Sequence, residues 1–204
     1  MNASKPLQCE APDQGEEAAR ADLYGLLATL FFAPPPQSLI DTIAAAHSAG
    51  DGVLERAWAE LALACKNARA EQVREEYEQL FISTGKPEVM LYGSYYLSGF
   101  LMEKPLAALR TDLAEFGLER VATMTESEDH IAVLCEVMRI LIASEGGLQA
   151  DIAAQRTFFA NHMQAWVPDA CEAISASRHA GLYAAVAKLA RTFFEVETQA
   201  FDME

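Results

Sequence analysis

The sequence predicts an all-α fold, a single-domain helical bundle of about eight or nine helices. Apolar residues recur at intervals of three and four along most of the chain, and proline and glycine clusters separate these stretches. No segment shows the alternation or the hairpin turns of β-strands. With 204 residues, 51% of them hydrophobic, the chain can form one sizeable core. We therefore expect a flexible N-terminus over residues 1–15 and an all-helical domain over residues 16–204.

Four helices are expected before residue 85. Residues 13–16 have the spacing of a capping box, and the apolar stripe that follows must end at Pro34-Pro35-Pro36. The next helices should span about 38–48 and 54–67, and a fourth should run from Glu71 to near Gly85. The fourth helix places three apolar side chains on one face, where a core position is the simplest interpretation: Tyr77, Leu80 and Phe81.

The segment from Gly85 to Gly93 has no helical period and is predicted to be a long connection that carries function or joins two lobes. Its end is rich in tyrosine, a residue type that is enriched in recognition surfaces but also fastens loops to a core. The residues concerned are Tyr92, Tyr95 and Tyr96, on either side of Gly93-Ser94.

Helices are again expected in the C-terminal half. One or two turns should fall within 94–102, and Pro105 suits the start of a helix that Gly117 ends, followed by a connection at 118–124. Thr125 to Glu128 has the spacing of a second capping box, which would open an apolar helix that Gly146-Gly147 ends. The remaining helices are expected at about 148–166, near Asp169, and at 182–200.

The acidic turn after Thr125 allows two interpretations. If Thr125 is the N-cap, Glu126, Glu128 and Asp129 lie in the first helical turn, where free N–H groups favour negative charge. Capping does not require His130, which follows Glu126 by four residues and would share its helical face. The turn is therefore either ordinary helix initiation or a carboxylate and imidazole site for a guanidinium group or a peptide amide.

Composition narrows the function classes. Thirty acidic against 15 basic residues give a net charge of -15, which repels nucleic acids and anionic lipids and attracts arginine-rich peptides. Metalloprotease, phosphate-loop and serine-hydrolase motifs are absent. We therefore expect no catalytic residues, no cofactor and no metal.

The N-terminal residues lack a signal-like apolar run and no later segment could span a bilayer, so a cytoplasmic protein is expected. The cysteines are too widely spaced for a zinc site and are expected to be reduced: Cys9, Cys65, Cys135 and Cys171.

Three segments, in this order and spacing, resemble the TorD/DmsD/NarJ family of redox-enzyme maturation chaperones. The family typically shows a Tyr-x-x-Leu-Phe helix, a Pro-Tyr-x-Ser-x-Tyr loop and a Glu-Pro-x-Asp-His turn. The matching segments here are Tyr77–Phe81, Leu91–Leu97 and Glu126–Ile131. Leu91 and Ser127 stand where the family usually has prolines, whereas Asp129 and His130 are intact.

The resemblance implies an all-helical cytoplasmic chaperone that binds the catalytic subunit of a molybdenum or tungsten oxidoreductase, in many cases through its twin-arginine signal peptide. We expect an apolar groove for the hydrophobic part of the peptide and carboxylates that hold its arginines. The expected peptide-binding residues are Tyr77, Leu80, Phe81, Tyr92, Ser94, Tyr95, Glu126, Asp129 and His130.

Two alternatives to this function stay open. A NarJ-like factor would assemble a cytoplasm-facing reductase subunit without export. A small helical enzyme would use Glu126, Asp129 and His130 as acid, base or metal ligands. For the partners, we expect neither nucleic acid nor stable membrane insertion, and a monomer or a homodimer.

Overall fold

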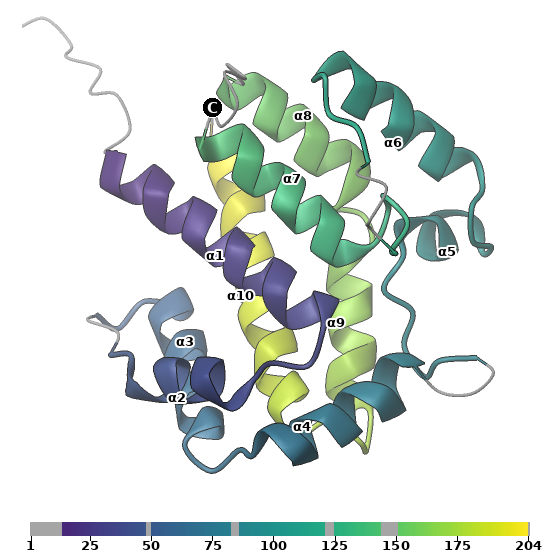
Figure 1. The fold of residues 1–204 in the computed structure, drawn as a ribbon. Coiled ribbons are helices and arrows are strands. Elements are labelled where there is room, and N and C mark those ends of the chain that lie inside the picture. Colours follow the sequence, from purple (N-terminus) through teal and green to yellow (C-terminus); the bar gives the residue numbers. More distant parts are fainter. Residues whose placement is uncertain (1–13, 48–49, 83–85, 121–124, 144–150, 204) are drawn as a thin grey trace, which may run out of the picture.

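The computed structural model describes residues 14–47, 50–82, 86–120, 125–143 and 151–203. Over these ranges it confirms the all-α class, with ten α-helices, one π-helical segment and no strand longer than an isolated bridge between Tyr92 and His130 (Figure 1). The elements are α1 (Gln14–Phe32), α2 (Gln37–Ala45), α3 (Val53–Cys65), α4 (Ala70–Tyr77), π-helical η1 (Glu78–Ile82), α5 (Gly93–Ser98), α6 (Lys104–Glu115), α7 (Ile131–Ala143), α8 (Ile152–His162), α9 (Val167–Ala176) and α10 (Leu182–Asp202).

Most predicted helix boundaries are confirmed within a few residues. α1 ends just before the three prolines, and α6 carries Pro105 in its first turn and ends before Gly117, whose φ of 69° suits glycine. The expected helix from Glu71 differs, because it widens after Tyr77 into the π-helical turn η1. Asp13 of the first capping box and the Gly146-Gly147 helix end lie outside the described residues, as does most of the expected flexible N-terminus.

The core is organised around α10. This helix packs against α3 and α9, while α1 lies along α7 on the side of the molecule that Figure 1 presents in front of α10. Leu80 and Leu106, on either side of the 86–92 connection, and Leu91 within it belong to one apolar cluster. The described helices before and after the connection therefore share a core.

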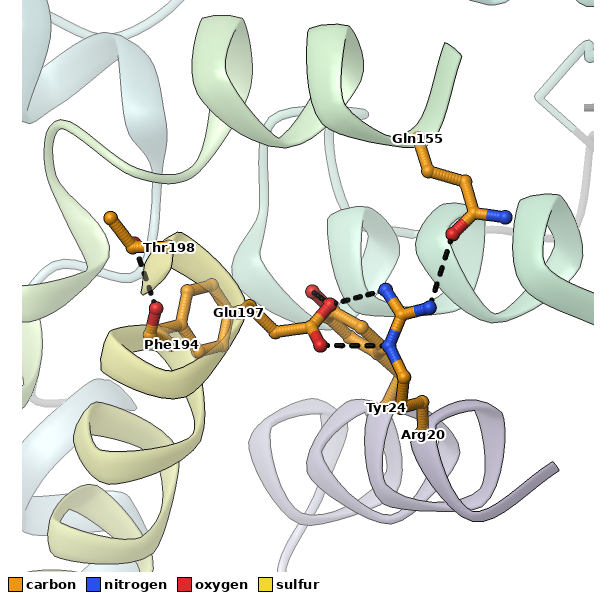
Figure 2. A network of polar contacts seen from close by, with 6 residues as sticks. All are labelled: Arg20, Tyr24, Gln155, Phe194, Glu197 and Thr198. Carbon is orange, nitrogen blue, oxygen red and sulfur yellow. Dashed lines mark hydrogen bonds and ion pairs between the residues drawn. The ribbon is translucent and has the colours of Figure 1, made fainter. Parts of the chain in front are cut away.

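A buried ion pair fixes α1 to α10 (Figure 2). The Arg20 guanidinium donates two hydrogen bonds of 2.8 Å to the carboxylate of Glu197, which also accepts a 3.0 Å bond from the Tyr24 hydroxyl. A longer bond of 3.4 Å joins Arg20 to Gln155 on α8. Burial and the charge of Glu197 hold the pKa of Tyr24 well above its usual value. The network thus satisfies polar groups that would otherwise be costly to bury.

Three cysteines in the described ranges are free and buried. Burial raises the pKa of the Cys65 thiol to about 11 and that of Cys171 to about 12, and it also raises the pKa of Cys135. These thiols are therefore protonated and unreactive in the folded chain. Cys9 lies outside the described residues. Within those ranges, none of the helices combines the length and the apolar character that crossing a membrane requires.

Candidate functional site

The acidic turn at residues 125–130 is not the start of a helix. The prediction of a capping box at Thr125 is wrong, because α7 begins only at Ile131. His130 occupies the N-cap position instead: its carbonyl accepts bonds from Val133 and Leu134, and its Nδ1 accepts the amide of Ala132 at 3.2 Å. Glu126 and His130 consequently do not share a helical face.

The turn pairs with the tyrosine-rich connection. The Gly93 amide donates to the carbonyl of Asp129 and the Ile131 amide to that of Leu91, each at 2.9 Å. The Asp129 carboxylate accepts the Ser94 amide at 2.9 Å and also the hydroxyl of Ser127. The bonds between the turn and the connection hold residues 127–130 in a non-helical conformation.

His130 is buried and neutral. Burial lowers its pKa to about 4, although the charges of Glu126 and Asp129 oppose the shift. Its ring lies edge-on to Tyr92 with 5.0 Å between centroids, and the Tyr92 hydroxyl donates to the Glu126 carboxylate. Tyr92, Glu126 and His130 therefore do meet, through this packing rather than through helical spacing.

The groove expected from Leu80, Phe81 and the tyrosines stays a prediction, and the described residues show where these side chains pack in the free chain. Tyr77 and Leu80 are buried, and the Tyr77 hydroxyl lies 3.0 and 2.9 Å from the carbonyl oxygens of Phe31 and Phe32, which accept its bond. The half-buried Phe81 packs edge-on against Tyr77. The core position that was the simplest interpretation of this stripe is thus confirmed for Tyr77 and Leu80.

The remaining predicted residues also have structural partners. Ser94 is buried, and its hydroxyl oxygen accepts the amide of Met102 at 3.2 Å. The half-buried Tyr95 accepts a 2.8 Å bond from the ammonium group of Lys86. Of the nine predicted peptide-binding residues, Glu126 reaches the pocket described next, and peptide binding by the other eight stays a prediction.

A pocket of about 540 Å³ lies between α1, the end of α6 and α7. Most of its wall is apolar, from Phe32 and the following prolines on one side and from Val133 and Val137 on the other. Sequence reasoning missed it, because the triple proline was interpreted only as a helix end. The lining residues are Ala28, Thr29, Phe32, Ala33, Pro34, Pro35, Pro36, Leu113, Leu118, Glu119, Arg120, Glu126, Glu128, Ala132, Val133, Glu136, Val137 and Ile140.

Four carboxylates and one guanidinium line this pocket. Glu128 accepts bonds of 3.0 and 2.9 Å from Arg110 of α6, and Glu136 accepts bonds of 2.9 and 2.8 Å from Arg139. Hydrogen bonding to Arg110 is the main cause that lowers the pKa of Glu128. The pocket therefore combines an apolar wall with carboxylates that already bind guanidinium groups.

Glu126, Asp129 and His130 do not form a metal site. Within the parts of the chain that the structure describes, no three histidine, cysteine or acidic side chains are grouped closely enough to hold a metal ion. The three residues hold the turn on the connection, with Asp129 and His130 each only 4% exposed.

The burial of neutral His130 predicts acid sensitivity. Below pH 6.5 the unfolded chain takes up a proton at His130, whereas the folded chain does so only near pH 4. The free energy of unfolding should therefore fall by about 3 kcal/mol as the pH drops through this window. Urea denaturation at several pH values measures it. The His130→Gln variant should lose this part of the pH dependence, and an unchanged slope in that variant would show that His130 is not its source.

The sequence of this chain is similar to proteins of one family. The family model described as nitrate reductase delta subunit matches residues 49–172. The chaperone protein TorD of Vibrio parahaemolyticus is 25% identical over 187 residues, covering 88% of this chain and 79% of that protein. The corresponding protein of Vibrio cholerae is 28% identical over 134 residues. This match covers 62% of this chain, and the chain spans only 61% of the length of that relative.

A solved structure shows a similar fold. It is the crystal structure of a candidate redox enzyme maturation protein from Archaeoglobus fulgidus, with a TM-score of 0.57 and 20% identity. The match covers 94% of this chain and 99% of the other. At this identity the likeness concerns the arrangement of helices.

Proposed function

Because the chain belongs to the nitrate reductase delta subunit family, which includes the TorD and NarJ proteins, we propose that it is a maturation chaperone for a molybdenum or tungsten oxidoreductase. Its client is the catalytic subunit, which it binds in the cytoplasm through a signal peptide with adjacent arginines. The chaperone names of its relatives and the amino-acid composition support this class.

The observation that carries the proposal is the pocket between α1, α6 and α7. Its apolar wall suits the hydrophobic stretch of a signal peptide, and its carboxylates suit the arginines that precede this stretch. The net charge of -15 adds a field that draws a cationic segment toward the chain. Apolar burial and bidentate ion pairing thus act on adjacent parts of one ligand.

Binding alone is sufficient for such a chaperone. A bound leader segment is withheld from the export machinery and from aggregation by mass action, and no bond needs to be made or broken. The enzyme alternative is disfavoured because Glu126, Asp129 and His130 have structural partners. The NarJ-like alternative uses the same chemistry on a subunit that is not exported. A monomer or a homodimer stays the prediction for the oligomeric state.

Titration with a synthetic peptide tests the proposal. The peptide has two adjacent arginines followed by an apolar stretch, and its control has glutamines in place of the arginines. We expect saturable binding by calorimetry, a clearly weaker control, and weaker binding as salt rises above 0.1 M, where charges are screened over about 10 Å. Equal affinity for both peptides, or no binding at all, would refute the proposed recognition.

A further inference from the structure

We propose that Arg110 occupies, within the free chain, the guanidinium subsite of the pocket, so that an arginine of the client must displace it from Glu128. The inference rests on the proposed function and adds a specificity residue and a competitor to it. No motif or resemblance in the sequence pointed to Arg110.

The geometry of the pair is that of a ligand contact. The Nε and Nη2 atoms of Arg110 donate to the two carboxylate oxygens of Glu128 at 3.0 and 2.9 Å, which is the parallel two-bond arrangement by which arginine recognises carboxylates. Glu128 itself lines the pocket, in the turn that the Asp129 contacts hold in place. The carboxylate is therefore shaped to receive a guanidinium group.

The two partners differ in how firmly the fold holds them. The side chain of Glu128 is 11% exposed, whereas that of Arg110 is 54% exposed and reaches the carboxylate from α6. The exposed Arg110 side chain can turn into solvent, where water solvates its charge, and the client arginine then takes over the pairing of Glu128. α6 would stay attached, because Asp112 on the same helix meets His162 of α8 at 2.6 Å.

The second arginine pair at the pocket is less suited to exchange. Arg139 and Glu136 lie three residues apart on α7, so their contact is local, and the Arg139 side chain is only 27% exposed. Its Cδ also lies 3.0 Å from the position that a Cβ on Gly25 would take, so the aliphatic part packs against α1. Arg110 is thus the more readily displaced of the two.

Exchange of one guanidinium for another keeps Glu128 paired throughout. A client arginine reproduces both bonds, whereas a lysine offers a compact point charge without the planar fork. Arg120 also lines the pocket, and after Arg110 its charge contributes to the lowered pKa of Glu128. The subsite should therefore prefer arginine to lysine, and Arg110 should weaken binding by competition.

The test is a titration of the wild type and five variants of the full chain with the two-arginine peptide. Arg110→Gln should bind the peptide about threefold more tightly than the wild type, as expected for loss of a competing arginine that is itself exposed. Arg191→Gln is the matched control, because it removes the same charge from an exposed ion pair on α10. Its affinity should equal that of the wild type. In the Glu128→Gln background, adding Arg110→Gln should bring no gain.

The outcomes separate this inference from the proposed function. If Arg110→Gln binds the peptide as tightly as the wild type or more weakly, the competition by Arg110 is refuted, and the proposed function stands. Equal tightening by Arg191→Gln would assign the effect to net charge and would also overturn it. If the wild type does not bind the peptide, the proposed function fails as well. Arg110→Lys, which keeps the charge but loses the fork, should give a smaller gain than Arg110→Gln.

Discussion

Replacing Glu197 by alanine is expected to lower the free energy of unfolding by about 3–5 kcal/mol. The Arg20 side chain, 18% exposed, would lose both bonds of its ion pair, and the buried Tyr24 hydroxyl would lose its acceptor (Figure 2). A buried charge left without its partner carries the full cost of its desolvation. Urea denaturation followed by circular dichroism measures the change.

Glu195→Ala is the matched control for this variant. It removes a carboxylate from the same helix, also paired with an arginine, but both Glu195 and Arg191 are about half exposed. Its effect should stay below about 0.5 kcal/mol. Equal losses in the two variants would contradict the assignment of the buried network as the tie between α1 and α10. Adding Arg20→Met to Glu197→Ala should recover part of the loss, since the unpaired charge is then removed.

The fold was predictable where local chemistry decides it. The three prolines after Phe32 and the glycine at 117 fixed the ends of α1 and α6, since proline and left-handed glycine act on the chain locally. The π-helical turn at Glu78–Ile82 was not predictable, because it keeps the same apolar face as an α-helix and differs only in its backbone hydrogen bonds.

The candidate site was much less predictable, because its contacts are long-range. Thr125 to Glu128 has the spacing of a capping box, yet Asp129 binds the amide of Ser94, 35 residues earlier, and this keeps the turn out of the helix. The pocket wall combines the end of α1 with α6 and α7. The spacing of apolar residues along one helix does not indicate which other helices pack beside it. Glu126 was predicted because it lies in an acidic turn with His130 four residues later, which is a local signal, whereas Phe32 had none.

The central claim is that the pocket beside Phe32 binds the apolar part of a peptide. Phe32→Ala should weaken the two-arginine peptide by about tenfold or more, because aromatic anchors dominate such interfaces. Phe32 is 45% exposed at the pocket wall, and its carbonyl, which accepts the Tyr77 bond, remains in the variant. The fold should therefore tolerate the change.

Phe100→Ala provides the comparison that decides the matter. Phe100 is also a surface phenylalanine, 70% exposed, and it lies between α5 and α6 outside the set of residues that line the pocket. The most direct measurement is a calorimetric titration of both variants with the same peptide. The account predicts a large loss of affinity for Phe32→Ala and none for Phe100→Ala. Unchanged binding by Phe32→Ala, or a loss confined to Phe100→Ala, would contradict it.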